Sequence, residues 1–257
     1  MKRHTRWILL LFGIYLLLPI LILALFSLTG ETEGWTLAHY RLLFSDKAFW
    51  DALGHTMTIT AASVSITLAV MAPLGFVVVA YVPRMEKWIK ALMLTPYALP
   101  GVITAVALLQ SYSNLGVSTV TLLGGAYCLL VMPLVYQSVS NSLYAMDIVP
   151  LTQAAQTLGA SPLQIFLRIV LPGILPGVLT GGLISIAALF GEFVLASILV
   201  GAKWPTVQYY LYEAMGSSSR LAAAVVISYI ALMAFLCVLF LALTPLQRHR
   251  DIQAKGD

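Results

Sequence analysis

The chain has 257 residues, of which 60% are hydrophobic and 9% are charged, and its mean hydropathy is +0.94. Soluble domains carry about 25% charged residues, so this composition excludes an ordinary soluble enzyme, and a net charge of +4 gives no reason to expect a nucleic-acid partner. Because the apolar residues come in runs of about 20, the length that crosses a bilayer, we expect an all-α polytopic membrane protein surrounded by lipid.

Six segments are predicted to cross the membrane, forming one transmembrane domain over residues 1–257. The first apolar stretch is too long for a secretory signal and lacks a clear cleavage site, so we expect an uncleaved first span. In the third segment, Pro96 and Pro100 prevent a regular helix and free backbone carbonyls at membrane depth. The predicted spans are about 7–28, 56–82, 91–110, 119–139, 172–200 and 221–243.

The polar segment between the first two spans carries apolar and aromatic residues at helical spacing. We expect these residues to form amphipathic turns that lie along the outer membrane interface. They are Leu37, Tyr40, Phe44, Phe49, Trp50 and Leu53.

The stretch around which the chain is organised is the loop 147–171, between the fourth and fifth spans. Two short helices are predicted in it. For the first, Pro150 suits the first helical position and Gly159 the left-handed residue after a helix end. Its apolar face, at i, i+3, i+4 and i+7, consists of Leu151, Ala154, Ala155 and Leu158.

The second short helix has the signature of a capping box. Ser161 is placed as the N-cap, Pro162 as the first helical residue and Gln164 as the third. The span that follows opens with small residues four apart, the pattern of close helix packing in membranes. These small residues are Gly173, Gly177, Gly181 and Ser185.

Basic residues predict the orientation of the chain, because they are enriched on the cytoplasmic side. Six spans with both termini in the cytoplasm place ten basic residues on that side and four on the other, and they also place the loop 147–171 in the cytoplasm. The ten are Lys2, Arg3, Arg6, Arg84, Lys87, Lys90, Arg168, Arg248, Arg250 and Lys255.

Little in the sequence indicates an enzyme. The four histidines lie outside the predicted spans without metal-ligand spacing, so no metal site is expected. Cys128 and Cys237 lie within apolar segments, where they serve as small apolar residues. No phosphate-binding GxxxxGK[ST] loop occurs, so the chain binds no cofactor of its own and any ATP hydrolysis belongs to another polypeptide.

Glu192 is the formally charged residue deepest in a predicted span. A carboxylate at the bilayer centre costs about 2.5–3.5 kcal/mol, so it requires a partner or a water-filled path. Two interpretations stay open, a residue of a translocation pathway and an interhelical hydrogen-bonding group. The candidate pathway residues are Glu192, Ser185, Pro96, Tyr97 and Pro100.

The loop 147–171 resembles the EAA signature of ABC-importer permeases. The match runs through Gln153-Ala154-Ala155, Gly159, Ile169 and Leu171-Pro172. The resemblance implies that Leu151, Gln153, Ala154, Ala155, Leu158 and Gly159 form a coupling helix that docks on a cytoplasmic ATPase. One position departs from the family: Gln153 stands where the signature has Glu, so this position offers a neutral hydrogen bond in place of a carboxylate.

Two further stretches are similar to particular permease groups. TLAHYRLLFSDKAFWDALGHT resembles the first external loop of spermidine/putrescine-type permeases, and Gly191-Glu192-Phe193 is similar to permeases for oxyanions and ferric iron. The resemblance therefore implies an importer in the inner membrane for a small polar solute, which is a polyamine, a phosphonate or other oxyanion, or ferric iron.

The resemblance also implies a set of partners. They are ABC ATPase subunits that hold ATP and Mg²⁺, a second permease subunit or second copy of this chain, and a periplasmic or lipid-anchored solute-binding protein. The alternative is an ion-coupled secondary transporter. Such a protein usually shows inverted repeats and several intramembrane ionisable groups, which this sequence lacks.

Overall fold

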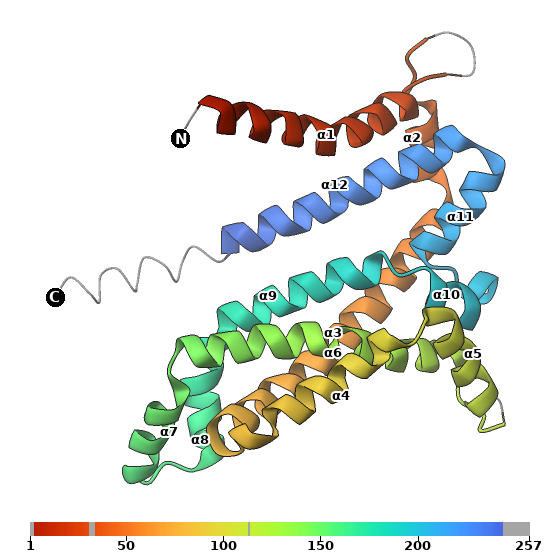
Figure 1. Cartoon of the computed structure of the whole chain (residues 1–257). Coiled ribbons are helices and arrows are strands. Elements are labelled where there is room, and N and C mark those ends of the chain that lie inside the picture. The colour runs from red at the N-terminus through yellow and green to blue at the C-terminus, as the bar shows by residue number, and fades with distance from the viewer. Residues whose placement is uncertain (1–2, 31–33, 113, 244–257) are drawn as a thin grey trace.

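The computed structural model describes residues 3–30, 34–112 and 114–243. Within these ranges the chain is all-α, as predicted, and the only β pairing is an isolated bridge between Thr29 and Trp35 (Figure 1). The longer helices are α1 (Arg3–Ser27), α3 (Lys47–Tyr81), α4 (Glu86–Ala98), α5 (Gly101–Tyr112), α6 (Thr119–Ala145), α9 (Leu171–Phe190), α11 (Val207–Ser217) and α12 (Ser219–Leu243). The shorter helical elements are α2 (Ala38–Ser45), η1 (Pro83–Met85), α7 (Ile148–Thr157), α8 (Pro162–Ile165), η2 (Phe166–Val170), α10 (Val194–Leu199) and η3 (Gly201–Lys203).

Helices α3, α6 and α9 form the centre of the molecule. Gly173, Gly177 and Gly181 of α9 lie against α6 and its C-cap Met146, where an added Cβ would collide with Met146 at Gly173 and with Ser142 at Gly177. The Ser138 hydroxyl of α6 donates a hydrogen bond to the Gly177 carbonyl at 2.7 Å. The close packing predicted from the small-residue spacing is confirmed, most clearly at Gly177, where an added Cβ would also stand 2.9 Å from the Ser138 carbonyl oxygen.

By length and composition, four described helices are able to cross a membrane: α3, α6, the continuous α8–η2–α9 unit, and α12 up to Phe240. A fifth candidate is the pair formed by η1–α4 and α5, which is bent by 93°. The described apolar part of α1, Leu11–Ser27, is shorter. The described part of the chain therefore supports a polytopic membrane protein with four or five such elements, and the count of six spans stays a prediction.

The bend between α4 and α5 falls at Leu99 and Pro100. Leu99 is extended, with φ −99° and ψ 127°, as a residue that precedes proline tends to be. Pro96 lies inside α4 and does not interrupt it. The predicted break in this segment is therefore present, and Pro100 is the proline at which it occurs.

The predicted span 172–200 is divided in the structure. Helix α9 ends at Phe190, and the separate helix α10 starts at Val194. Glu192, expected deep within one continuous span, lies in the short connection between the two helices. The expectation of an unbroken segment was wrong, because apolar composition alone does not show where a helix stops.

At the end of the molecule opposite α7, helices α2 and α11 pack on α12, and the first turns of α3 join them in one buried cluster (Figure 1). The amphipathic turns predicted here are present, although Phe49 and the residues after it belong to α3 and not to a separate interfacial helix. The Tyr210 hydroxyl of α11 donates to Asp46 Oδ2 at 2.7 Å. Burial and this hydrogen bond raise the pKa of Tyr210 above its ordinary value.

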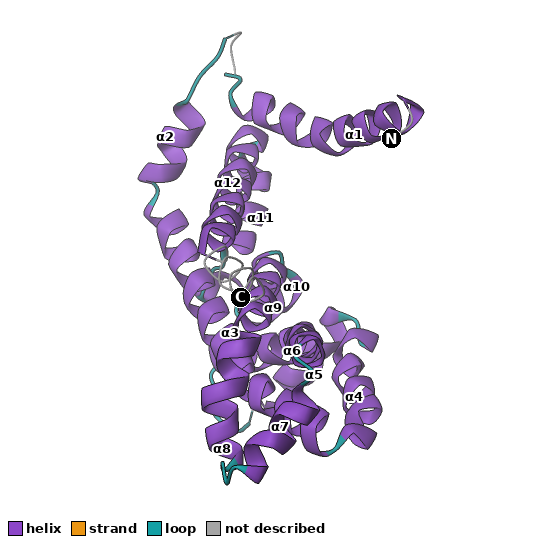
Figure 2. Cartoon of the chain, turned by 90° about the vertical axis from the view of Figure 1, so that its left-hand side faces the viewer, coloured by secondary structure: helices purple, strands orange, loops and turns teal. Residues whose placement is uncertain are grey.

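Helix α1 leads away from the rest of the bundle and lies next to α12 near its own C-terminal end (Figure 2). The guanidinium of Arg220 lies 5.8 Å from the ring centroid of Phe26 at this contact. The start of α1, the end of α12 and α7 all lie toward the same side of the molecule (Figure 1).

Candidate functional site

Helix α7 begins two residues earlier than predicted. It runs from Ile148, after Asp147 in the left-handed conformation with φ 49° and ψ 56°, so Pro150 is its third residue and not its first. Proline is tolerated there because the first-turn amides of a helix have no partner within the helix.

The two faces of α7 differ sharply in exposure. Leu158 is 88% exposed, and Leu151, Gln153 and Ala154 are also exposed, whereas Ala155 is only 8% exposed. The predicted apolar face therefore splits. Ala155 belongs to the buried side, because the helical turn places it next to the buried residues Ile148 and Thr152. The surface left for a partner consists of Leu151, Gln153, Ala154 and Leu158, here called the α7 outer face.

The chain leaves α7 through a well-defined stop. Gly159 is left-handed with φ +83°, as predicted. Its N–H donates to the Gln156 carbonyl at 2.9 Å, and the N–H of Ala160 donates to the Ala155 carbonyl at 3.1 Å. These two bonds form a Schellman motif, in which glycine adopts positive φ without the steric cost of a Cβ.

The predicted capping box at the start of α8 is confirmed. The Gln164 N–H donates to Ser161 Oγ at 3.3 Å, and the Ser161 N–H donates to Gln164 Oε1 at 2.9 Å. Pro162 is the first residue of α8, as expected. The Schellman motif and the capping box together fix the direction of the chain between α7 and α9.

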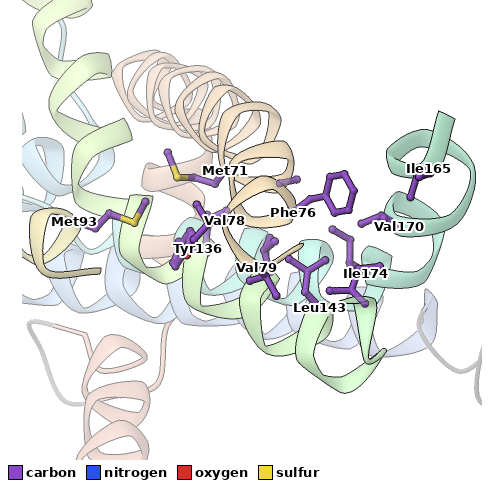
Figure 3. Close-up of a cluster of buried hydrophobic side chains, with 14 of the residues drawn as sticks. Met71, Phe76, Val78, Val79, Met93, Tyr136, Leu143, Ile165, Val170 and Ile174 are labelled. Carbon is purple, nitrogen blue, oxygen red and sulfur yellow. The ribbon is translucent and has the colours of Figure 1, made fainter. Parts of the chain in front are cut away.

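The inner side of the loop is joined to the ends of the long helices. Ile165 and Val170 face Phe76 of α3 within one buried cluster, which also includes Ile148 and Ala155 (Figure 3). The Gln156 side chain donates to the Tyr81 hydroxyl at the end of α3 at 3.2 Å. Residues of α7, α3 and the start of α9 therefore share one close-packed core.

A groove of about 550 Å³ lies between α4, α6 and α9. Tyr97 lines it and donates from its hydroxyl to the Leu130 carbonyl at 2.8 Å. The other predicted pathway residues, Pro96, Pro100, Ser185 and Glu192, are not among its lining residues. Ser185 is fully buried, and its hydroxyl donates to the Gly181 carbonyl at 2.7 Å within α9.

Glu192 is held by three hydrogen bonds. Its Oε1 accepts from the Leu195 N–H at 2.9 Å, and its Oε2 accepts from the Ala196 N–H at 3.2 Å, so the carboxylate caps the start of α10. The Tyr127 hydroxyl of α6 also donates to Oε2, at 3.4 Å. Of the two interpretations left open by the sequence, these contacts favour the hydrogen-bonding group.

Sequence reasoning missed the polar lining of the groove. Lys90 of α4, Gln137 and Asn141 of α6, and Thr180 of α9 all line it. One signal was available, because Gln137 and Asn141 are two amides four residues apart at the end of an apolar run. In the described part of the chain, no group of three or more His, Cys, Asp or Glu residues is arranged to hold a metal ion.

Comparison with known proteins identifies the family to which this chain belongs. Residues 65–250 match the model of the family described as binding-protein-dependent transport system inner membrane component. The chain is 27% identical to the putrescine transport system permease protein PotI of Escherichia coli K12, over 98% of this chain and 96% of PotI. It is 24% identical to the spermidine/putrescine transport system permease protein PotC of the same strain, over 77% of each chain.

Among solved structures, a chain of a bacterial ABC transporter that imports the acidic polysaccharide alginate has the same fold. Its TM-score is 0.69 at 17% identity, and the match covers 93% of this chain and 97% of that one. The family match covers more than half of the sequence, and it decides against the alternative of an ion-coupled secondary transporter. The chain therefore belongs to the binding-protein-dependent transport system inner membrane components, and it is a multi-pass permease subunit of an ABC importer, not an enzyme.

Proposed function

We propose that the α7 outer face docks in a groove of a cytoplasmic ATPase subunit, and that the chain forms half of the pathway for a small polar solute delivered by a binding protein. The observation that carries the proposal is the contrast within α7. One side of the helix is packed into the cluster that joins α3 and α9, while Leu158 and its neighbours project from the end of the bundle. An exposed leucine beside small residues suits insertion into a partner's groove.

The expected mechanism is alternating access. ATP and Mg²⁺ are held by the ATPase subunits, whose closure displaces α7. The displacement reaches α3 through Gln156 and Tyr81, and it reaches α9 through Ile165 and Val170. Packed helices have discrete arrangements, so such a push changes which side of the pathway is open.

The orientation and the other partners belong to the same proposal. We place both termini in the cytoplasm, because the basic residues predict that orientation and because the start of α1 and the end of α12 lie toward the side of α7. A second permease subunit, or a second copy of this chain, completes the pathway, and the solute-binding protein docks at the outer end near α2 and α11. The solute classes under consideration are a polyamine, a phosphonate or other oxyanion, and ferric iron.

Within the pathway we assign different roles to the five candidate residues. Tyr97 lines the groove, and Pro100 sets the α4–α5 bend beside it, whereas Pro96 lies within the uninterrupted helix α4. Ser185 and Glu192 serve the packing of α9 and the start of α10, because their polar atoms are already hydrogen-bonded there.

A photo-crosslinking amino acid at position 158 tests the docking surface. In the assembled complex we expect a crosslink from this position to the ATPase subunit. The same amino acid at position 212 is the matched control, because Tyr212 is also strongly exposed but lies on α11 at the opposite end. A crosslink to the ATPase from position 212, or none from position 158, would refute the assignment.

A further inference from the structure

The groove between α4, α6 and α9 is built from one face of each helix. Lys90 and Tyr97 are seven residues apart on α4, while Gln137 and Asn141 are four apart on α6. Thr180 joins them from α9. These spacings repeat on one side of a helix, so the polar groups converge on the same space. A volume of about 550 Å³ suits a small molecule.

The polar face of this groove is unsuited to lipid. Gln137, Asn141 and Thr180 are all exposed. Polar side chains within membrane spans are costly against hydrocarbon, and they normally face the interior of a bundle or a water-filled cavity. In the assembled importer this face must therefore border water or the second permease subunit.

The charged side chain that lines the groove is Lys90, whose ion-pair partner Glu86 lies outside the lining. The Lys90 ammonium lies 2.7 Å from Glu86 Oε1, and the Tyr144 hydroxyl donates to the other oxygen, Oε2. The Lys90 side chain is 38% exposed, whereas that of Glu86 is only 14% exposed. Both carboxylate oxygens are thus occupied, while the ammonium keeps further N–H donors. Among the described residues that line the groove, none carries a carboxylate.

The amides extend this donor set. The Gln137 amide donates to Asn141 Oδ1 at 2.9 Å, which leaves the NH₂ group of Asn141 available. A negatively charged group in the groove would meet an ammonium and amide N–H donors. A dication would meet a like charge and no carboxylate among the described lining residues, and like charges brought together are unfavourable.

We propose that the groove between α4, α6 and α9 is the solute subsite of this permease, and that it admits anionic solutes and disfavours polyamine cations. The inference rests on the proposed function and narrows its solute class. The solute expected for this chain therefore differs from the putrescine named for PotI, although the two sequences align over 98% of this chain.

Charged thiol reagents measure this preference without knowledge of the natural solute. Thr180→Cys is introduced into a chain whose Cys128 and Cys237 are replaced by serine. The variant is assembled with its permease and ATPase partners in lipid nanodiscs. Labelling rates are measured with an anionic sulfonatoethyl and a cationic trimethylammonioethyl methanethiosulfonate. Each rate is divided by that reagent's rate with a free thiol in solution.

We expect the anionic reagent to react about five-fold faster than the cationic one after this normalisation, because one ammonium acts at short range in a partly desolvated site. Lys90→Gln should bring the ratio near one, and Glu86→Gln should raise it, because Lys90 loses its partner. Met215→Cys on exposed α11 is the control position, and its ratio should not respond to Lys90→Gln.

Three outcomes would overturn the inference: a ratio at or below one, a ratio that Lys90→Gln leaves unchanged, or no labelling by either reagent with and without ATP. The crosslink from position 158 is measured on the same preparation. If that crosslink persists while the anion preference is absent, the solute subsite fails and the proposed coupling to the ATPase stands.

Discussion

A short helix starts after a turn at two places, α7–α8 and α9–α10. Both starts are capped by a side chain, but the surroundings of the two helices differ. Ser161 with Gln164 caps α8, and Glu192 caps α10. Within α10, Leu195, Ala196 and Leu199 are buried, whereas the α7 outer face is exposed.

Under the proposed function, an exposed apolar surface is a better marker of the partner-binding site than a charge within a predicted span. Glu192 drew attention in the sequence because it is charged, yet its oxygens already accept three hydrogen bonds. Leu158 carries no charge and was predicted only as one member of an apolar face, yet this residue at the C-terminal cap of α7 is 88% exposed. The contrast yields four tests, given in order of expected effect.

The largest effect is expected from a charge on the buried side of α7. Ala155→Asp places a carboxylate in the cluster that contains Ile165 and Val170, and should lower the free energy of unfolding by at least about 3 kcal/mol. The measurement is the amount of monodisperse protein extracted in mild detergent, with its unfolding temperature. Ala154→Asp is the matched control, because the neighbouring alanine is exposed. Equal destabilisation by both changes would contradict the division of the helix into two sides.

A charge on the α7 outer face should weaken binding of the ATPase subunit without lowering the stability of the permease. Leu158→Glu removes an exposed apolar anchor, and we expect the ATPase subunit to bind about 30-fold more weakly, or worse, with the unfolding temperature unchanged. Pull-down of the ATPase on immobilised permease gives the affinity. Leu163→Glu, on an exposed residue of α8 outside the α7 outer face, serves as the comparison. The docking model is wrong if the two variants bind the ATPase equally well.

Local chemistry explains what the sequence predicted well. The Gly159 stop and the Ser161 capping box depend on nearby residues, and the packing of Gly177 depends on the absence of a side chain. These signals lie within a few residues of the feature that they specify.

Tertiary contacts decide the features that the sequence did not predict. The apolar spacing of α7 placed Ala155 with Leu151, but the neighbouring helices bury Ala155. The stop of α9 before Glu192 and the polar groove beside Gln137 also depend on which helices meet. A periodic pattern of apolar residues identifies one face of a helix, but it does not show which residues of that face a neighbouring helix buries.

A moderate loss of stability is expected when the α10 cap is removed. Glu192→Ala deletes the acceptor of the Leu195 and Ala196 amides, and the cost of a lost helix cap is about 1–2 kcal/mol. The unfolding temperature in detergent should fall accordingly. Glu192→Gln keeps a side-chain oxygen for one of these amides and should lose less. A pathway role would give the opposite pattern, with normal stability in both variants and altered transport in Glu192→Gln.

The smallest effect is expected at the position where the chain departs from the EAA signature. Gln153 is exposed on α7, and none of its side-chain atoms is needed for the stop at Gly159 or for the bond between Gln156 and Tyr81. Gln153→Glu therefore should leave the unfolding temperature unchanged within about 0.5 kcal/mol, as is usual for a surface substitution. If the ATPase presents a basic side chain opposite this position, a carboxylate there strengthens binding by about 1 kcal/mol or less, and raised salt removes the gain. Gln156→Glu is the control, because it introduces the same charge one turn further along, where the amide instead donates to Tyr81. Weaker ATPase binding by Gln153→Glu with normal binding by Gln156→Glu would show that the partner's groove is fitted to a neutral side chain at position 153.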